Sequence, residues 1–240
     1  METRSQPMRI AIADDQLEDV EALAATLRDA GYACTCMTNG DDVIAALRRE
    51  TFDLLLLDWN MPRSSGLDVV VWANENLPNP PPIMLLTSRD NKDDVIRALD
   101  SGAMDYIVKP GDPDIIRARI SAALRRRGID SGNEAATFAG FTFDRARQAV
   151  TFAGETVELR AKEFELSRLL FENINRPLSR SYIMARVWNA SPDMETRTLD
   201  MHISRIRAKL MLRPERGVVL RTIFGFGYRL DSCESNSEVG

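Results

Sequence analysis

The feature that most constrains the fold is an alternation of short apolar runs with amphipathic segments between residue 9 and about residue 127. This alternation is typical of repeated strand–helix units around a parallel sheet. The apolar runs predict five strands, at residues 10–13, 33–37, 53–57, 83–87 and 105–108. The first helix is predicted to bury one face, which carries Leu17, Val20, Ala24 and Leu27. We therefore expect a doubly wound α/β domain over residues 8–127.

The rest of the chain has a different pattern. Residues 128–136 are polar and aperiodic, which predicts a flexible linker. Alternating stretches in 138–159 then predict an antiparallel sheet, and helical periods return in 161–172, 180–187 and 195–212. A closing hairpin is expected at 218–223 and 228–230, with its turn at 224–227. These patterns predict an α+β domain over 137–231 and a disordered tail over 232–240.

Charge is distributed unevenly between the two predicted domains. The whole chain has a net charge of −5, but residues 1–127 hold 15 Lys/Arg and 21 Asp/Glu, whereas residues 137–230 hold 16 and 10. An acidic half joined to a basic half indicates a regulatory domain linked to a domain with a polyanionic partner. Chance variation between two globular halves is the alternative at this point.

Membrane attachment and disulfide bonding are both unexpected. The apolar run 54–57 is far too short to span a bilayer and no signal-peptide core opens the chain, so a cytoplasmic location without membrane contact is expected. Cys34 and Cys36 are interpreted as pointing to opposite faces of one strand, which would exclude a mutual disulfide. Together with Cys233 they are expected to be reduced packing residues.

Acidic residues follow two of the predicted parallel strands. Asp14 and Asp15 lie at the C-terminal end of the first strand and Asp58 at that of the third, so the three carboxylates should share a crevice. A hard cation such as Mg²⁺ would relieve their repulsion. Thr87 and Lys109 end the fourth and fifth strands, and a hydroxyl and an ammonium suit a transferred phosphoryl group. The pattern predicts a phosphorylation site.

These residues, with Pro110 after Lys109, resemble the receiver domain of bacterial two-component response regulators over about residues 8–127. The resemblance implies that Asp58 is the phosphoacceptor and that Asp14, Asp15, Asp58 and the carbonyl of Asn60 hold Mg²⁺. It also implies that Thr87 and Lys109 contact the phosphoryl oxygens and that Tyr106 is the switch aromatic. Pro62 and Gly66 match the family's loop.

Two other α/β classes fit less well. Phosphatases that resemble haloacid dehalogenases would need an aspartate two residues after the nucleophile, where this chain has Asn60. A flavodoxin-like nucleotide binder would need a glycine-rich phosphate loop after the first strand, and none is present.

The predicted helix 195–212 combines an apolar stripe with a polar row. Leu199, Ile203, Ile206 and Leu210 are expected to face the core. The neighbouring face carries Thr198, His202, Arg205 and Lys209, with Arg197 and Arg207 beside them. Such a row suits the major groove, where arginine can read guanine and other residues can meet phosphates. A merely solvated basic face is the alternative.

The segments Arg176-Pro-Leu-Ser-Arg180, Val187-Trp188, Arg197–Arg207 and Gly225-Phe-Gly-Tyr-Arg229 resemble the winged-helix effector of OmpR/PhoB-type regulators over about 137–230. The resemblance implies that 195–212 is the recognition helix and that Arg205 reads bases. Residues 189–195 would touch RNA polymerase. Contacts to the DNA backbone are implied for Arg197, His202, Thr222 and Tyr228. Arg207 and Lys209 are further DNA-binding candidates because of their place in and beside the polar row.

The chain departs from that family at several positions. Phe224 stands where the wing often has an arginine, Ser204 replaces a frequent basic residue, and Gly111 replaces a common aromatic. The family's dimer face implies an interface that includes Val95, Leu99, Asp105, Ile115 and Arg119. Val95 and Ile115 are apolar where a cation and an acid often pair, so a more apolar homodimer is expected, with Asp105 and Arg119 as a remaining charged pair.

The resulting hypothesis is a transcriptional regulator and not an enzyme that turns over an external substrate. A sensor histidine kinase would phosphorylate Asp58, receivers would pair, and two effector domains would bind tandem promoter half-sites. A regulator controlled by ligand or protein contact and an Asp-dependent phosphatase with a basic accessory domain remain as alternatives. The sequence does not identify the kinase, the stimulus, the operator or the direction of regulation.

Overall fold

A computed structural model describes residues 7–88, 92–126, 135–189 and 197–233. The chain divides into two compact units, Met1–Asp130 and Ser131–Gly240, and each is described by itself. None of the helices in these described ranges is both long and apolar enough to cross a membrane.

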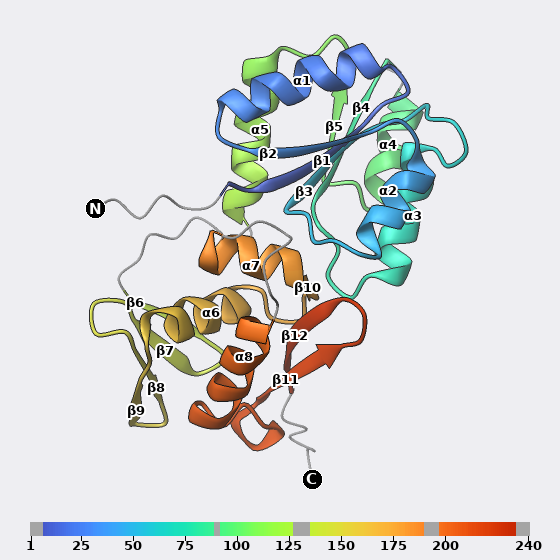
Figure 1. Ribbon diagram of the computed structural model, residues 1–240. Coiled ribbons are helices and arrows are strands. Elements are labelled where there is room, and N and C mark those ends of the chain that lie inside the picture. Colours follow the sequence, from blue (N-terminus) through green and yellow to red (C-terminus); the bar gives the residue numbers. More distant parts are fainter. Residues whose placement is uncertain (1–6, 89–91, 127–134, 190–196, 234–240) are drawn as a thin grey trace. The chain divides into compact units, whose positions relative to one another are not determined.

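The first unit is a five-stranded parallel sheet with helices on both faces (Figure 1). Its strand order is β2-β1-β3-β4-β5, which confirms the predicted doubly wound α/β fold. The strands are β1 (Arg9–Ala13), β2 (Ala33–Met37), β3 (Leu54–Asp58), β4 (Ile83–Thr87) and β5 (Asp105–Val108). The helices are α1 (Leu17–Asp29), α2 (Gly40–Leu47), α3 (Gly66–Asn76), α4 (Lys92–Asp100) and α5 (Pro113–Arg126).

Two apolar layers hold this unit together, one on each face of the sheet. Successive residues of a strand point to opposite faces, so Leu55 and Leu57 pack with α2, α3 and α4. Leu54 and Leu56 pack on the other face with α1 and α5. Every residue of β3 is buried, which explains the uninterrupted apolar run that precedes Asp58.

Two expectations about this unit were wrong. Leu17 is 57% exposed, because helical side chains lean toward the N-terminus and Leu17 is the first residue of α1. Cys34 and Cys36 lie two residues apart on β2 and therefore share a face, where both pack against the α1 and α5 layer. They are half-buried free thiols, and burial raises the pKa of Cys34 to about 11.

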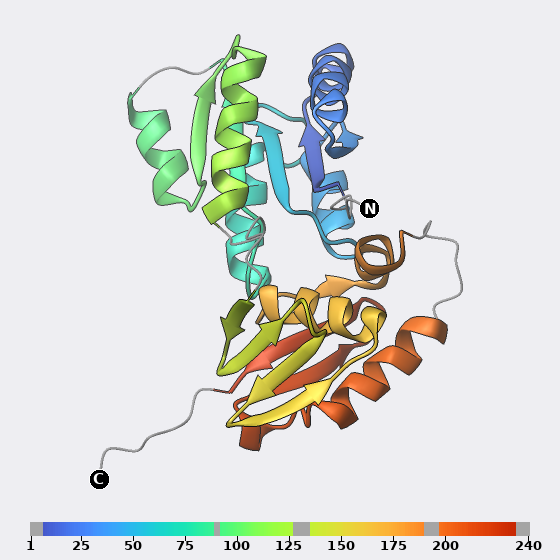
Figure 2. The same cartoon turned by 90° about the vertical axis from the view of Figure 1, so that its left-hand side faces the viewer.

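The second unit packs three helices between two antiparallel sheets (Figure 2). One sheet contains β6 (Ala135–Phe138), β7 (Phe141–Asp144), β8 (Ala149–Phe152) and β9 (Glu155–Glu158) in that order. The other has the order β10-β12-β11, from β10 (Leu178–Ser179), β11 (Val218–Ile223) and β12 (Gly227–Ser232). The helices are α6 (Ala161–Glu172), α7 (Arg180–Trp188) and α8 (Arg197–Lys209), and a 3₁₀ turn, η1, spans Pro214–Arg216. This is the α+β winged-helix fold that the sequence predicted.

A single apolar core joins the helices to both sheets. The predicted apolar stripe of α8 is buried, and so is Leu210, which follows the helix. Leu199, Ile203, Ile206 and Leu210 are each at most 2% exposed. Phe141 and Phe143 enter the same core from β7, where both rings contact Phe171 of α6. The opposite surface of α8 is consequently presented away from the core.

Three element boundaries of the second unit differ from the predictions by more than one residue. β6 begins at Ala135, inside the predicted linker, because Ala135 and Ala136 pair with β7. β12 continues through Ser232, inside the predicted tail, because Ser232 pairs with Val218. α8 ends at Lys209 and not at residue 212, because Met211 has a left-handed φ of 45° that a helix cannot accommodate. Residues 195–196 of the predicted helix lie outside the described residues.

Candidate functional site

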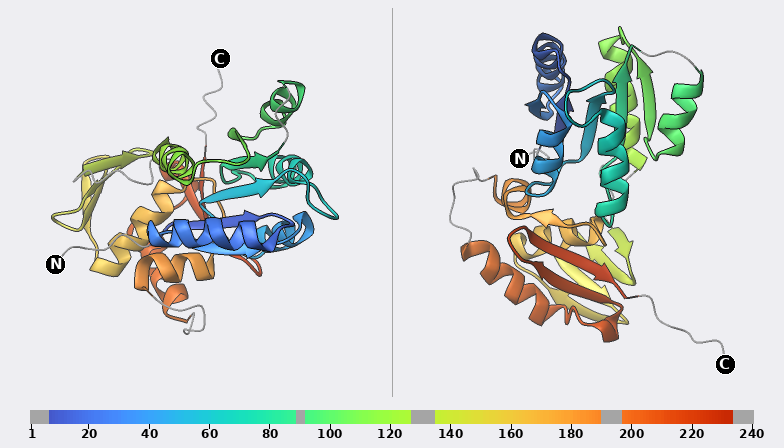
Figure 3. Two further views of the ribbon diagram at one scale, coloured as in Figure 1. Left: turned by 90° about the horizontal axis from the view of Figure 1, so that it is seen from above. Right: turned by 90° about the vertical axis from the view of Figure 1, so that its right-hand side faces the viewer.

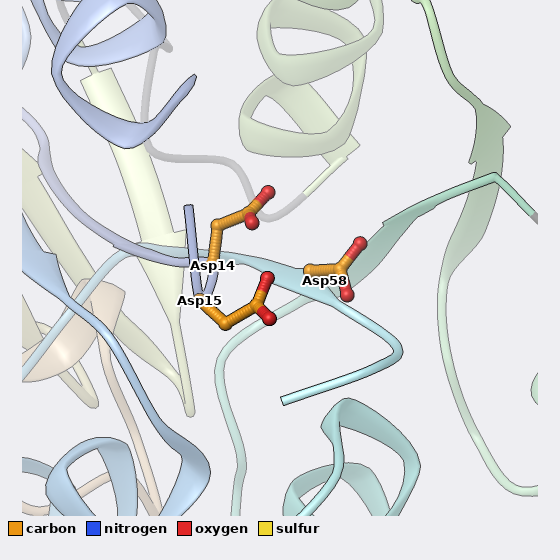
Figure 4. Close-up of side chains that lie close together, drawn as sticks. All are labelled: Asp14, Asp15 and Asp58. Carbon is orange, nitrogen blue, oxygen red and sulfur yellow. The ribbon is translucent and has the colours of Figure 1, made fainter. Parts of the chain in front are cut away.

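Three carboxylates meet at the C-terminal edge of the parallel sheet. Asp14 and Asp15 directly follow β1, and Asp58 is the last residue of the neighbouring β3. One oxygen from each lies within 4.8 Å of the others, and Figure 4 shows the three side chains clustered. The register of two adjacent parallel strands therefore produces the predicted convergence.

Lys109 supplies positive charge to this cluster. Its ammonium contacts the Asp14 carboxylate and lies 2.9 Å from Asp58 Oδ1. Burial of the Asp58 carboxyl raises its pKa, and the Asp14 charge adds to that rise, which hydrogen bonding and attraction from Lys109 only partly offset. Burial lowers the pKa of Lys109, but its two carboxylate partners outweigh this and hold it above the ordinary value. Asp14 and Asp58 are 5% and 6% exposed, so these charges interact in a largely dry environment.

The loop after β3 holds Asp58 through its backbone. The Asn60 N–H donates to Asp58 Oδ2, and the Gly66 N–H donates to the Trp59 carbonyl at 3.0 Å. A Cβ on Gly66 would lie 2.2 Å from the Asp58 carbonyl oxygen, closer than non-bonded atoms approach. The loop therefore requires glycine at this position.

Thr87 and Tyr106 lie on the strands that close the pocket. Thr87 ends β4, is completely buried, and its carbonyl accepts a 2.8 Å hydrogen bond from the Lys109 N–H. Lys109 precedes a cis peptide bond to Pro110. The Tyr106 ring is 9% exposed and meets Trp59 edge-on, with 6.2 Å between ring centroids. Four of the strands thus contribute a predicted residue to one edge of the sheet.

The predicted dimer residues differ in how exposed they are. Leu99 of α4 and Ile115 of α5 are 45% and 53% exposed, whereas Val95 is half-buried and packs on the core of its own unit. Arg119 donates to both carboxylate oxygens of Asp105 within the same chain, at 2.9 and 2.7 Å. Among the predicted interface residues, Leu99 and Ile115 are consequently the apolar side chains that remain available to a partner.

The predicted DNA-contact residues of α8 and the β11–β12 hairpin fall into two groups, and the first is at least partly open to solvent. Thr198 and Arg205 are exposed, and Arg205 makes no hydrogen bond or ion pair with any residue that the structure describes. His202 is half-buried: its Nδ1 lies 2.7 Å from the Thr198 carbonyl and its ring meets Trp188 edge-on. Arg197 begins the helix, but its side chain is outside the described part of the molecule.

Side chains in the second group bind other parts of their own domain. Arg207 donates from Nε to the Leu220 carbonyl at 3.0 Å and from Nη2 to Thr222 Oγ1 at 3.1 Å. Lys209 Nζ lies 2.6 Å from Oε2 of Glu163, a carboxylate only 1% exposed. Burial tends to raise the pKa of Glu163, but hydrogen bonds from Lys209 and the Arg160 backbone outweigh this and lower it.

Tyr228 also belongs to the second group, and it lies in a cluster that the sequence analysis missed. It is 4% exposed and its hydroxyl donates to Asp200 of α8. Arg180, at the start of α7, donates to the same carboxylate oxygen and places its guanidinium 5.5 Å from the Tyr228 ring centroid. The three residues come from α7, α8 and β12, and no local pattern in the sequence indicates that they meet.

Comparison with known proteins agrees with both halves of this description. Residues 10–121 match the family model "Response regulator receiver domain", and residues 154–230 match "Transcriptional regulatory protein, C terminal". A receiver that carries a winged helix defines a DNA-binding response regulator. Receiver domains bind Mg²⁺ through an acidic cluster of the kind that Asp14, Asp15 and Asp58 form.

Full-length relatives identify the branch. The chain is 35% identical over 225 residues to the sensory transduction protein RegX3 of Mycobacterium tuberculosis, covering 92% of this chain and 98% of the relative. It is 37% identical over 227 residues to the response regulator protein PmrA of Pseudomonas aeruginosa, covering 93% and 98%. The solved Thermotoga maritima OmpR/PhoB homolog DrrB is 26% identical, covering 94% and 100%, with a TM-score of 0.46. The chain belongs to the OmpR/PhoB-type response regulators, the DNA-binding transcription regulators of two-component systems.

Proposed function

We propose that Asp58 accepts a phosphoryl group from a sensor histidine kinase. The observation that supports this most is the Asp58 carboxylate at the open edge of the sheet with the Lys109 ammonium 2.9 Å away. A carboxylate oxygen of Asp58 would attack phosphorus as the bond to the kinase histidine breaks, giving an acyl phosphate and a neutral imidazole. Lys109 would offset the phosphoryl charge, and the Thr87 hydroxyl would donate to a phosphoryl oxygen.

Mg²⁺ is the cation that we propose for the acidic cluster. Carboxylates of Asp14, Asp15 and Asp58 offer clustered oxygen ligands, and the Asn60 carbonyl lies two residues beyond Asp58. Hard divalent cations prefer such oxygens. When bound, Mg²⁺ would reduce the repulsion between the carboxylates and the incoming phosphoryl oxygens. To bind the ion, Asp14 and Asp58 would each give up some of the ion pairing that they now make with Lys109.

Phosphorylation would act on the protein by shifting a conformational population. Thr87 is fully buried, so its hydroxyl must move to reach a phosphoryl group. Thr87 pairs with Val108 of β5, and Tyr106 lies two residues before Val108 on the same strand. Movement of these side chains would alter the α4–β5–α5 surface that carries Leu99 and Ile115. A homodimer formed through this surface would raise the avidity of the effector domains for two adjacent half-sites.

DNA recognition is assigned to the exposed face of α8. Arg205 is proposed to read a base in the major groove, and Arg197, His202 and Thr222 to contact the backbone. Arg207, Lys209 and Tyr228 would orient α8 against β11, β12 and α6, or rearrange when a phosphate arrives. The proposed polymerase-contacting segment, 189–195, lies almost entirely outside the described residues. Such a regulator would act in the cytoplasm on promoter DNA and would turn over no substrate beyond its own phosphoryl group.

Selection from randomised duplex DNA tests this function. The full chain is incubated with and without beryllofluoride and Mg²⁺, and the bound duplexes are sequenced. Stronger enrichment of repeated half-sites with beryllofluoride is the expected result. Equal enrichment would leave a DNA binder that ligand or protein contact controls, and no enrichment in either sample would contradict the proposed function.

A further inference from the structure

The tip of the β11–β12 hairpin presents a phenylalanine to solvent. Phe224 is 101% exposed, whereas the next most exposed large apolar side chain among the described residues, Leu17, is 57% exposed. Scattered apolar residues on a surface are ordinary. A fully exposed aromatic ring, however, gives up all the stabilisation that burial of its large apolar area would provide. This ring is therefore the described apolar group most available to a partner.

The turn that carries Phe224 has a defined backbone. The Phe226 N–H donates to the Ile223 carbonyl at 3.0 Å, which closes a four-residue turn with Phe224 at its second position. Gly225, at the third position, has a φ of 71°, the left-handed conformation that a type II turn needs there. Phe224 therefore projects from a hydrogen-bonded turn of fixed shape.

The residues next to the turn are held equally closely. Gly227 pairs with Ser179 of β10, and a Cβ on Gly227 would lie 2.1 Å from the Leu178 carbonyl oxygen. The Arg180 N–H donates to the Phe226 carbonyl at 3.1 Å. Backbone contacts on this side leave the tip little freedom to fold back and bury the Phe224 ring.

The hairpin is also tied to the recognition helix. Arg207 of α8 bonds to Leu220 and Thr222 of β11, and Figure 3 shows α8 and the hairpin side by side. A helix that enters the major groove brings an attached hairpin toward the neighbouring groove of the same duplex. The link through Arg207 thus places Phe224 at a fixed offset from Arg205.

The charge around the tip favours a polyanionic partner. The segment from Arg221 to Arg229 contains two arginines and no acidic residue. Arg221 is 59% exposed on its side chain and shares Asp231 with Arg229, so the pair keeps a net positive charge. An apolar ring at the tip of a hairpin whose strands carry net positive charge matches the two chemistries of a DNA groove, which are stacked bases and rows of phosphates.

We propose that Phe224 is an apolar wedge that inserts between two adjacent base pairs in the minor groove and bends the DNA. This inference rests on the proposed DNA-binding function. Wedges of this type partly unstack one base step and kink the duplex toward the major groove. Specificity at this position would follow from the deformability of the step, since pyrimidine–purine steps unstack most readily, and not from hydrogen bonds to base edges.

The test uses the full chain and a duplex carrying half-sites enriched from randomised DNA. 2-Aminopurine is placed at each successive step beside a half-site, and dyes at the duplex ends report bending by energy transfer. The wild-type protein should raise 2-aminopurine fluorescence at one step and shorten the end-to-end distance. Phe224→Ala should lose both signals and bind roughly 10- to 100-fold more weakly, the fold-change that corresponds to burying one aromatic side chain.

Two further variants separate a wedge from other roles. Phe224→Trp should retain unstacking, whereas Phe224→Arg should lose it and should steepen the dependence of log affinity on log salt by about one. Phe224→Ala should keep the wild-type melting temperature because Phe224 is fully exposed in the free protein. A Phe224→Ala protein with unchanged affinity and unstacking would overturn the proposal.

The remaining outcomes are also decisive. If Phe224→Ala reduced only the cooperativity between two half-sites and not binding to one, the ring would contact a protein and the wedge would be wrong. If Arg205→Ala abolished selective binding while Phe224→Ala changed nothing, the DNA-binding function would stand without the wedge. A wild-type protein that bound no duplex would overturn both.

Discussion

The acidic pocket was predicted from polar residues at strand ends and the basic helix from a polar row on one face, and the structure arranges the two sets of residues differently. In the pocket, Asp14, Asp58 and Lys109 come from three strands and lie in contact. On α8, Arg205 is free of partners among the described residues, whereas Arg207 binds β11 of its own domain. The sheet brings its predicted site residues together in one pocket. On the helix, some predicted DNA-contact side chains are exposed to solvent and others bind their own domain.

The difference follows from what each pattern specifies. Parallel strands in register place the residues that follow them at a common edge, so a strand assignment nearly determines the pocket. Helical periodicity determines only which face a residue occupies, and long side chains on that face reach neighbouring elements. Lys209, for example, turns to the buried carboxylate of Glu163. Substitutions in each region test this difference.

The largest expected effect is at Asp58. Asp58→Asn should abolish phosphorylation by acetyl phosphate, because the amide cannot act as the nucleophile in place of the carboxylate. Intact-protein mass spectrometry after incubation with acetyl phosphate and Mg²⁺ measures the phosphorylated fraction. Asp41→Asn, an exposed substitution outside the pocket, is the matched control and should be phosphorylated normally. Full phosphorylation of the Asp58→Asn protein would show that Asp58 is not the residue that accepts the phosphoryl group.

Removing one carboxylate should weaken the cation site. Asp15 is exposed, so Asp15→Asn should leave the fold intact and lower Mg²⁺ affinity roughly 10- to 100-fold, as expected when a group supporting a metal site is lost. The fluorescence of Trp59, next to Asp58, can report the titration. Asp19→Asn on α1 removes a nearby exposed charge that the cluster does not include and should have little effect. Equal affinities for the wild type and Asp15→Asn would exclude Asp15 from the site.

The two groups on α8 should separate when binding and stability are measured together. Arg205→Ala should cost about 1–3 kcal/mol of DNA-binding free energy and relax preference at one base, with unfolding unchanged. Arg207→Ala should lower the free energy of unfolding by about 0.5–1.5 kcal/mol, since it removes hydrogen bonds to Leu220 and Thr222. Denaturant unfolding and binding titrations give both quantities. If Arg205→Ala destabilised the fold as much as Arg207→Ala, the division into two groups would fail.

The smallest effect concerns acid stability of the winged helix. Burial tends to raise the pKa of Asp200, but hydrogen bonds from Tyr228 and Arg180 and attraction to Arg180 lower it. Its contribution is therefore present above the unfolded pKa of about 3.9 and is lost as pH falls through the lower folded value. Because the side chain is 52% exposed, the contribution should be less than ~1 kcal/mol.

Asp200→Asn should accordingly flatten the dependence of unfolding free energy on pH below about pH 4. Thermal melts between pH 3 and 7 test this, with Asp114→Asn, a side chain 82% exposed on α5, as the control. Parallel pH profiles for the wild type and Asp200→Asn would contradict the proposed cluster.

Much of the fold was predictable because its signals are local. The strand at residues 83–87 and the helix at residues 161–172 have the predicted bounds, since uninterrupted apolar runs and helical periods were both clear. Boundaries that depend on strand pairing were not predictable. β6 and the end of β12 have no strand pattern of their own and exist because they pair with the neighbouring strand of a hairpin, Ala135 with Asp144 and Ser232 with Val218.

The sites divide in the same way. Strand ends were enough to bring Asp14, Asp58 and Lys109 together. The meeting of Arg180, Asp200 and Tyr228 depends on the packing of α7, α8 and β12, and the exposure of Leu17 depends on where α1 begins. The cluster of Arg180, Asp200 and Tyr228 follows from tertiary packing, which no window of sequence contains.

The most direct test of the account is the affinity of the phosphorylated and unphosphorylated full chain for duplexes with one selected half-site or two. If phosphorylation of Asp58 controls receiver pairing, it should raise affinity for the tandem site by at least about tenfold and leave the single half-site nearly unchanged. Equal gains on both duplexes, or no gain on either, would contradict control of DNA binding through phosphorylation-dependent dimerisation.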